Sequence, residues 1–186
     1  MYVNDPNSYL HRPTRGWSNR VVTVLRSDFT GFDLAVKVTH FTVEGHYLVV
    51  RVMVVVLPLY IHNVYAPFDR QEKRQFFSSL VTEEFEDHVT HLVLGNLSTS
   101  LNPRLDSSTP HPHYDSGPSS CIKWIAKLVV VDAWRIHADN TRGLSVPLPR
   151  KNRLHYMLLS ETLSKRCYED SRHFVQKQQE TILITV

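Results

Sequence analysis

The chain has 186 residues, a length that suits one domain with a sizeable core. Its apolar fraction of 42% and its charged fraction of 21% are ordinary for a soluble globular protein. The formal charge of +3 is mildly basic, which is compatible with a phosphate-bearing partner but does not require one. No apolar run approaches the length of a membrane span, and the N-terminus lacks the unbroken apolar stretch of a signal peptide. We therefore expect a soluble protein of the cytoplasm or nucleus without membrane contacts.

The first part of the chain predicts a loop followed by strands. Residues 1–15 are polar and contain two prolines, so we expect loop or extended chain there and one domain over residues 16–186. Strands are expected at residues 20–25, 34–41 and 47–56, from their β-branched content or their alternation of polar and apolar residues. The turn Glu44-Gly45-His46 joins the last two of these strands as a hairpin.

A strand, loop, helix, strand series follows. A strand is expected at residues 60–64, a helix over residues 71–85 from the three- and four-residue spacing of its apolar side chains, and a strand at residues 91–94. Polar residues gather where these strands end. In layered α/β folds those ends are where the chemistry is usually built.

The rest of the chain repeats this arrangement. Residues 98–120 predict a long loop and residues 119–127 a helix with one apolar face. Residues 129–134 predict a strand or turn, and the short apolar runs at 154–159 and 182–186 predict the last two strands.

Several short motifs occur in a fixed order along the chain. They are Asn63-Val64-Tyr65-Ala66-Pro67, Phe76-Phe77-Ser78-Ser79-Leu80, Leu94-Gly95-Asn96-Leu97-Ser98, Leu101-Asn102-Pro103, Asp132-Ala133-Trp134-Arg135 and Asn152-Arg153-Leu154-His155-Tyr156. Together they resemble the endonuclease/exonuclease/phosphatase superfamily, and most closely the apurinic-endonuclease-like domain of LINE-type (non-LTR) retrotransposons. The likeness extends from about Gly16 to the C-terminus.

The resemblance implies a fold, an activity and a cofactor. The implied fold is a DNase I-like, four-layer α/β/β/α sandwich of two mixed sheets, here without its first strands because the match begins past them. The implied activity is phosphodiester cleavage of DNA that depends on a divalent metal, usually magnesium, with no small-molecule cofactor. Magnesium prefers carboxylate oxygens, and it offsets the charge that builds in the transition state.

The chain departs from the family at most charged positions of the implied site. Asn63 and Tyr65 match the family pattern. Asn96 stands where the family motif GDFN has aspartate, Ser98 where it has asparagine, and His155 where the motif SRLDY has aspartate. The terminal Asp-His pair of the family has no counterpart, whether it is aligned at residues 171–173, 178–179 or 181–182. We expect magnesium binding to be compromised in this chain.

Three functions are compatible with this pattern. A neutral amide at position 96 cannot act as a general base, and losing one member of a catalytic unit typically costs orders of magnitude in rate. The first expectation is therefore a retroelement nuclease domain that is impaired or inactive. The second is a residual nuclease whose metal is held by other groups, and the third is a non-enzymatic nucleic-acid-binding module that uses the old groove.

Some individual residues keep alternative interpretations. Tyr65 fits a phosphate contact and a half-buried structural tyrosine equally well. Asn96 with His155 could hold a softer metal such as zinc, although isolated substitutions are favoured because no spacing motif supports a metal site. His111 and His113 lie in a Pro/Ser-rich loop and are expected to be solvated.

The remaining charged residues are expected to be structural or solvated. Residues 83–87 are expected to form a solvated acidic face. Asp132 is expected to support the turn at Trp134 and Arg135, and Asp106 is expected to face solvent. Residues 150–153 are expected to be a soluble loop rather than a nucleic-acid contact.

Overall fold

The computed structural model describes residues 8–9, 21–23, 25–26, 28–54, 57–80, 85–107, 118–138 and 152–167. The strands are β1 (Ser8–Tyr9), β2 (Leu25–Arg26), β3 (Val36–Lys37), β4 (Tyr47–Val54), β5 (Leu57–Tyr65), β6 (Thr90–Asn96), β7 (Val130–Asp132) and β8 (His155–Ser160). The helices are α1 (Arg70–Ser79), α2 (Pro103–Asp106), α3 (Pro118–Lys127), α4 (Ala133–Ala138) and α5 (Glu161–Cys167), with 3-10 turns η1 (Phe32–Leu34) and η2 (Thr39–Phe41). None of the described helices is long and apolar enough to cross a membrane.

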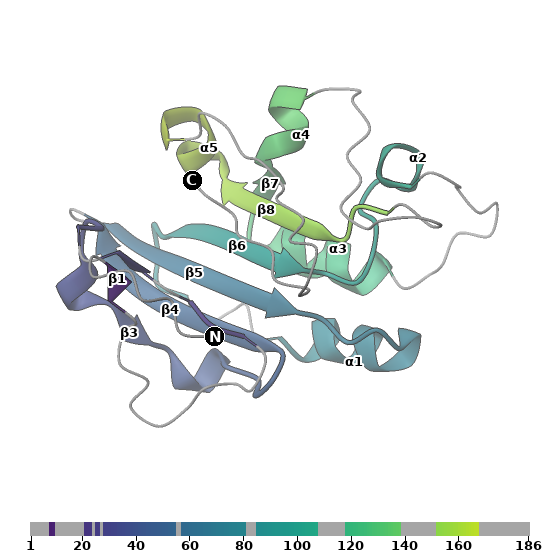
Figure 1. Ribbon diagram of the computed structural model, residues 1–186, viewed down its shortest axis with the longest axis horizontal. Helices are drawn as coiled ribbons and strands as arrows, with labels where there is room; N and C mark the ends of the chain where they lie inside the picture. The colour runs from purple at the N-terminus through teal and green to yellow at the C-terminus, as the bar shows by residue number, and fades with distance from the viewer. Residues whose placement is uncertain are drawn as a thin grey trace.

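One mixed sheet organises the described part of the molecule, with strands in the order β3-β4-β5-β6-β8-β7 (Figure 1). β5 pairs with β4 as an antiparallel hairpin and with β6 in parallel. The parallel pair needs a crossover connection, which α1 provides. β8 then pairs antiparallel with both β6 and β7, so that a late strand of the chain lies beside the central ones.

The two faces of the sheet carry separate apolar clusters. On one face, α1 and α3 pack over the sheet, and the fully buried Trp124 of α3 contacts Tyr47 and Phe77. The opposite face buries Val50, Ile61 and their neighbours together with Leu25 of β2. β1 and β2 pair as a second, two-stranded sheet. The α/β class expected from the sequence is confirmed.

α1 illustrates how local sequence sets an element. The side chain of Asp69 accepts hydrogen bonds from the backbone N–H groups of Gln71 and Glu72, which caps the helix. Phe76 and Phe77 face the core as their spacing predicted. The predicted end of this helix at residue 85 is wrong, because α1 ends at Ser79. Phe85 belongs to a separate bend and packs on other aromatic rings of the core.

The predicted strand over residues 34–41 is also wrong in its extent. Only Val36 and Lys37 form a strand, and a 3-10 turn lies on either side of them. Local hydrogen bonds, from Leu34 N to Gly31 O and from Thr42 N to Thr39 O, curl the chain at both ends. The predicted strand at residues 182–186 lies outside the described residues.

Candidate functional site at the strand ends

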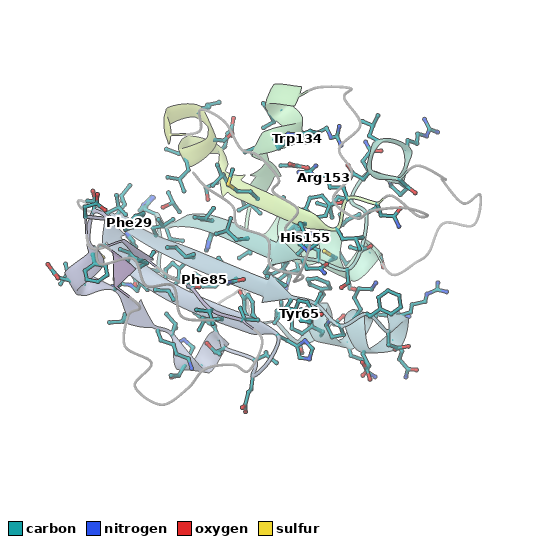
Figure 2. The ribbon with its side chains drawn as sticks, in the orientation of Figure 1. Phe29, Tyr65, Phe85, Trp134, Arg153 and His155 are labelled. Carbon is teal, nitrogen blue, oxygen red and sulfur yellow. The ribbon has the colours of Figure 1, made fainter. Side chains whose placement is uncertain are left out.

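Three of the predicted site residues lie in one row across the sheet. Tyr65 is the register partner of Asn96 in the parallel pair β5–β6, and Asn96 is the partner of His155 in the antiparallel pair β6–β8. Register partners on adjacent strands lie about 5 Å apart and point to the same face. Figure 2 shows Tyr65 and His155 at the end of the sheet from which α1 extends. We call Tyr65, Asn96 and His155 the strand-end row.

Asn63 lies two residues before Tyr65 and therefore shares its face of β5. Its amide Nδ2 donates a hydrogen bond of 2.7 Å to the backbone oxygen of Val22. Asn63 thus ties the segment before β2 to the sheet and uses one of its two side-chain N–H donors to do so.

The turn after β6 fixes the orientation of Asn96. Asn96 Oδ1 accepts a hydrogen bond of 2.7 Å from the backbone N–H of Ser98, whose φ is 50°. Gly95 has a φ of 126°, and a Cβ at that position would lie 2.0 Å from the backbone oxygen of Val64. Only glycine can therefore occupy position 95, where the end of β6 lies close against the backbone of β5.

Ser98 connects this turn to the loop that follows β5. Its Oγ donates to Ala66 O at 2.8 Å, and Ala66 N donates to Asn96 O at the same distance. The Nζ of the buried Lys73 in α1 donates to Ser98 O. The strand-end row is therefore held by backbone and side-chain hydrogen bonds from both loops and from α1.

His46 extends the row by one strand and was not singled out as a site residue from the sequence. It immediately precedes β4, and its backbone oxygen accepts from Tyr65 N at 2.8 Å. Its Nδ1 lies 2.8 Å from Tyr65 O, and the two rings stack at an angle of 13°. Because a carbonyl only accepts, Nδ1 carries the proton. The predicted turn at residues 44–46 was the available signal, since the start of β4 must lie beside the end of β5.

The row does not fit magnesium. Its side chains are a phenol, an amide and an imidazole, and Ser98 adds a hydroxyl, whereas magnesium is held chiefly through carboxylates and substrate oxygens. Among the described residues no three His, Cys, Asp or Glu side chains are grouped so that they could hold a metal ion. The described part of the chain therefore gives no support to the zinc alternative for Asn96 and His155 either.

The carboxylates nearest to the family motifs are used elsewhere. Asp106 was expected to face solvent, but its side chain is only 1% exposed. It accepts hydrogen bonds from Arg135 Nη2, from Tyr156 Oη at 3.1 Å and from the backbone N–H of Asn102 at 2.9 Å. The expectation was wrong because α2 turns Asp106 inward, where arginine and tyrosine offset the cost of burying its charge.

Arg153 corrects a second expectation. It was placed in a soluble loop, but its side chain is 1% exposed. It binds Asp132 through two hydrogen bonds, of 2.6 Å and 2.8 Å, and its guanidinium lies 4.5 Å from the ring centroids of both Trp134 and Tyr156 (Figure 2). Asp132 also accepts from the backbone N–H of Arg135, as its predicted turn-supporting role requires. We call Asp106, Asp132, Arg135 and Arg153 the buried ion network.

Besides the strand-end row and the buried ion network, a third cluster of polar side chains lies on the face of the sheet covered by α1 and α3. His62 is fully buried, with Nδ1 2.6 Å from Tyr47 Oη and Nε2 2.9 Å from His91 Nδ1. Burial lowers the pKa of His91 to about 4, and burial together with the charge of His91 lowers the pKa of His62 well below 6.5. Burial raises the pKa of Tyr47, so its hydroxyl remains a donor. These residues form a neutral chain of hydrogen bonds rather than a solvent-facing site.

The chain is similar in structure to several DNA-processing enzymes. It matches an AP endonuclease from Leishmania major with a TM-score of 0.54 and 13% identity over 76% of this chain and 57% of that one. It matches the catalytic domain of Xenopus laevis APE2 with a TM-score of 0.53 and 17% identity, covering 70% of this chain and 51% of that one. A 3′ phosphatase from Neisseria, solved with its product DNA hairpin, gives 0.53 and 18% over 67% and 56%.

These comparisons bear on the fold alone. No protein-family model matches the sequence, and no curated protein matches it. The chain spans between 51% and 57% of the length of these structural neighbours. The fold that the sequence motifs implied is confirmed.

Proposed function

We propose that this chain, which has the fold of the endonuclease/exonuclease/phosphatase superfamily, is a retroelement-derived endonuclease domain with impaired hydrolysis. The retroelement origin rests on the motifs at residues 63–67, 94–98 and 152–156. The strand-end row supplies groups that can hydrogen bond a phosphate, and it lies where layered α/β folds bind ligands.

The hydrogen bond of Asn96 is the observation that carries the proposal. Because Asn96 Oδ1 accepts from the Ser98 N–H, the other polar group of its side chain is the Nδ2 donor. An aspartate in the same orientation would keep one oxygen on Ser98 N–H and present the other, negatively charged, toward a metal ion or a water molecule. The amide can therefore donate to a phosphate oxygen, but it cannot deprotonate the attacking water.

Cleavage of supercoiled plasmid by the purified chain tests the proposal directly. With magnesium or manganese, the native chain is expected to nick DNA no faster than with a chelator. Metal-dependent nicking gained by Asn96→Asp would show that the groove still binds DNA and that the lost carboxylate was limiting. Asn102→Asp is the matched control, because it adds the same charge at an exposed position outside the row. Metal-dependent nicking by the native chain would overturn the proposal and require substitute ligands.

Non-enzymatic binding of nucleic acid is the second candidate function. The same Asn96 donor favours it, because a neutral donor suits a phosphate better than a carboxylate does. DNA binding whose affinity falls as salt rises, without cleavage by the native chain, is the result expected of a binding module. A folded chain that neither binds nor cleaves DNA would contradict it.

A further inference from the structure

Phe68 is the most exposed large apolar side chain among the described residues. It is 90% exposed, compared with 74% for Val129 and 60% for Leu34. Exposure of a whole phenyl ring forgoes about 2 kcal/mol or more of burial free energy. Because Phe68 packs on almost nothing in the chain itself, folding gives no account of why an aromatic residue stands there.

The loop that carries Phe68 is anchored at both ends. On one side, Ala66 is bound to Asn96 O and to Ser98 Oγ. On the other side, Asp69 caps α1, and hydrogen bonds from the backbone N–H groups of Glu72 and Gln71 lower the pKa of its carboxyl group. The ring therefore projects from a fixed position, which reduces the entropy lost when a ligand packs on it.

The surroundings of Phe68 suit a polyanion. The residue lies three positions after Tyr65, the β5 member of the strand-end row. It is followed directly by α1, which packs on α3. The exposed basic residues of the two helices are Arg70, Arg74, Lys123 and Lys127, while the acids in α1 and its cap are Glu72 and Asp69 and α3 has none. Basic charge beside an exposed aromatic ring is the combination that binds single-stranded nucleic acid.

We propose that Phe68 stacks on an unpaired nucleobase of a nucleic-acid strand whose phosphate occupies the strand-end row. This inference rests on the proposed function and adds a preference for unpaired bases. A phenyl ring has no hydrogen-bonding group, so it recognises the flat face of a base without reading its sequence. That face is accessible in single strands and at strand ends, and it is covered inside a duplex.

Binding of a short fluorescent oligothymidylate, followed by anisotropy at low salt, tests the inference. Phe68→Ala is expected to weaken binding about 5- to 150-fold, which corresponds to the loss of one stacked base. Phe68→Trp is expected to restore it, with quenching of tryptophan fluorescence beyond any change in the native chain. Leu34→Ala, which truncates another exposed side chain, is the matched control and should bind as the native chain does.

A strand of abasic residues separates stacking from loss of charge or fold. Native chain and Phe68→Ala should bind the abasic strand equally, since no base is present to stack. An equal loss on both strands, or no loss on either, would overturn the inference while leaving DNA binding intact. If the native chain binds no oligonucleotide at all, both the proposed phosphate binding at the strand-end row and the proposed stacking on Phe68 are overturned. Urea unfolding of Phe68→Ala should match the native chain, because the ring is not packed.

Discussion

Arg153 and His155 are two residues apart in one motif, yet they belong to regions of opposite character. Arg153 matches the family pattern and lies in the buried ion network, where it binds Asp132 and stacks on aromatic rings. His155 departs from the pattern and lies in the strand-end row at the start of β8. The residue on which packing depends fits its surroundings, whereas the residue on which hydrolysis would depend has changed.

The difference follows from what each position costs to alter. Removing one partner of a buried ion pair leaves the other charge desolvated and unpaired. Replacing a carboxylate at the rim of the sheet removes a charge without leaving another one stranded. Folding therefore constrains the ion network strongly and the row weakly, so the fold can persist when the polar residues of the row change.

The largest expected loss of stability comes from replacing Arg153 in the buried ion network. Arg153→Ala is expected to lower the free energy of unfolding by about 3 to 5 kcal/mol, because it removes the arginine that binds Asp132 and one of the two arginines beside the buried Asp106. Lys165→Ala, which removes an exposed i,i+4 pair with Glu161, should leave the free energy of unfolding nearly unchanged. Urea unfolding monitored by circular dichroism measures both. Similar costs for the two variants would contradict the structural importance of the network.

The buried neutral histidines His62 and His91 should make the stability of the fold depend on pH. His62 and His91 accept a proton in the unfolded chain near pH 6.5, but in the folded chain only at much lower pH. Their contribution to stability is therefore complete above about pH 6.5 and is lost as the pH falls toward 4. Each histidine should add a slope of up to about 1.4 kcal/mol per pH unit. Urea unfolding between pH 7 and pH 5 measures this slope.

His91→Gln isolates one of the two histidines. Glutamine can still accept a hydrogen bond from His62 Nε2 but does not titrate, so the slope should fall by about half. An unchanged slope would show that the acid sensitivity arises elsewhere in the chain.

The smallest expected change in the free energy of unfolding comes from relieving backbone strain at two residues with positive φ. Val129 has a φ of 52° and is 74% exposed, so Val129→Gly should raise the free energy of unfolding by about 0.5 to 1 kcal/mol as strain is relieved. Ser98 has a φ of 50°, but its Oγ holds Ala66 O. Ser98→Gly should give no gain, since a lost hydrogen bond offsets the relieved strain. Thermal unfolding of both variants tests this, and equal stabilisation would show that the Ser98 hydrogen bond contributes little.

Much of the local structure was readable from the sequence. The spacing of Phe76 and Phe77 predicted α1, and the apolar face around Trp124 predicted α3. The apolar run at 91–94 predicted β6, which ends at Asn96 just before the turn at Ser98. Periodicity, capping and turn chemistry act between neighbours in the chain, and these features are therefore written in short stretches of sequence.

The burial of Asp106 and the pairing of His62 with His91 were not readable in this way. His62 meets His91 because β5 pairs with β6, and Asp106 meets Tyr156 because β8 enters between β6 and β7. The sequence by itself determined most of the elements, the motifs and the neutral residues that stand where the resembled motifs have aspartate. Only the tertiary structure decided which polar groups are desolvated together, because long-range strand pairing sets that environment.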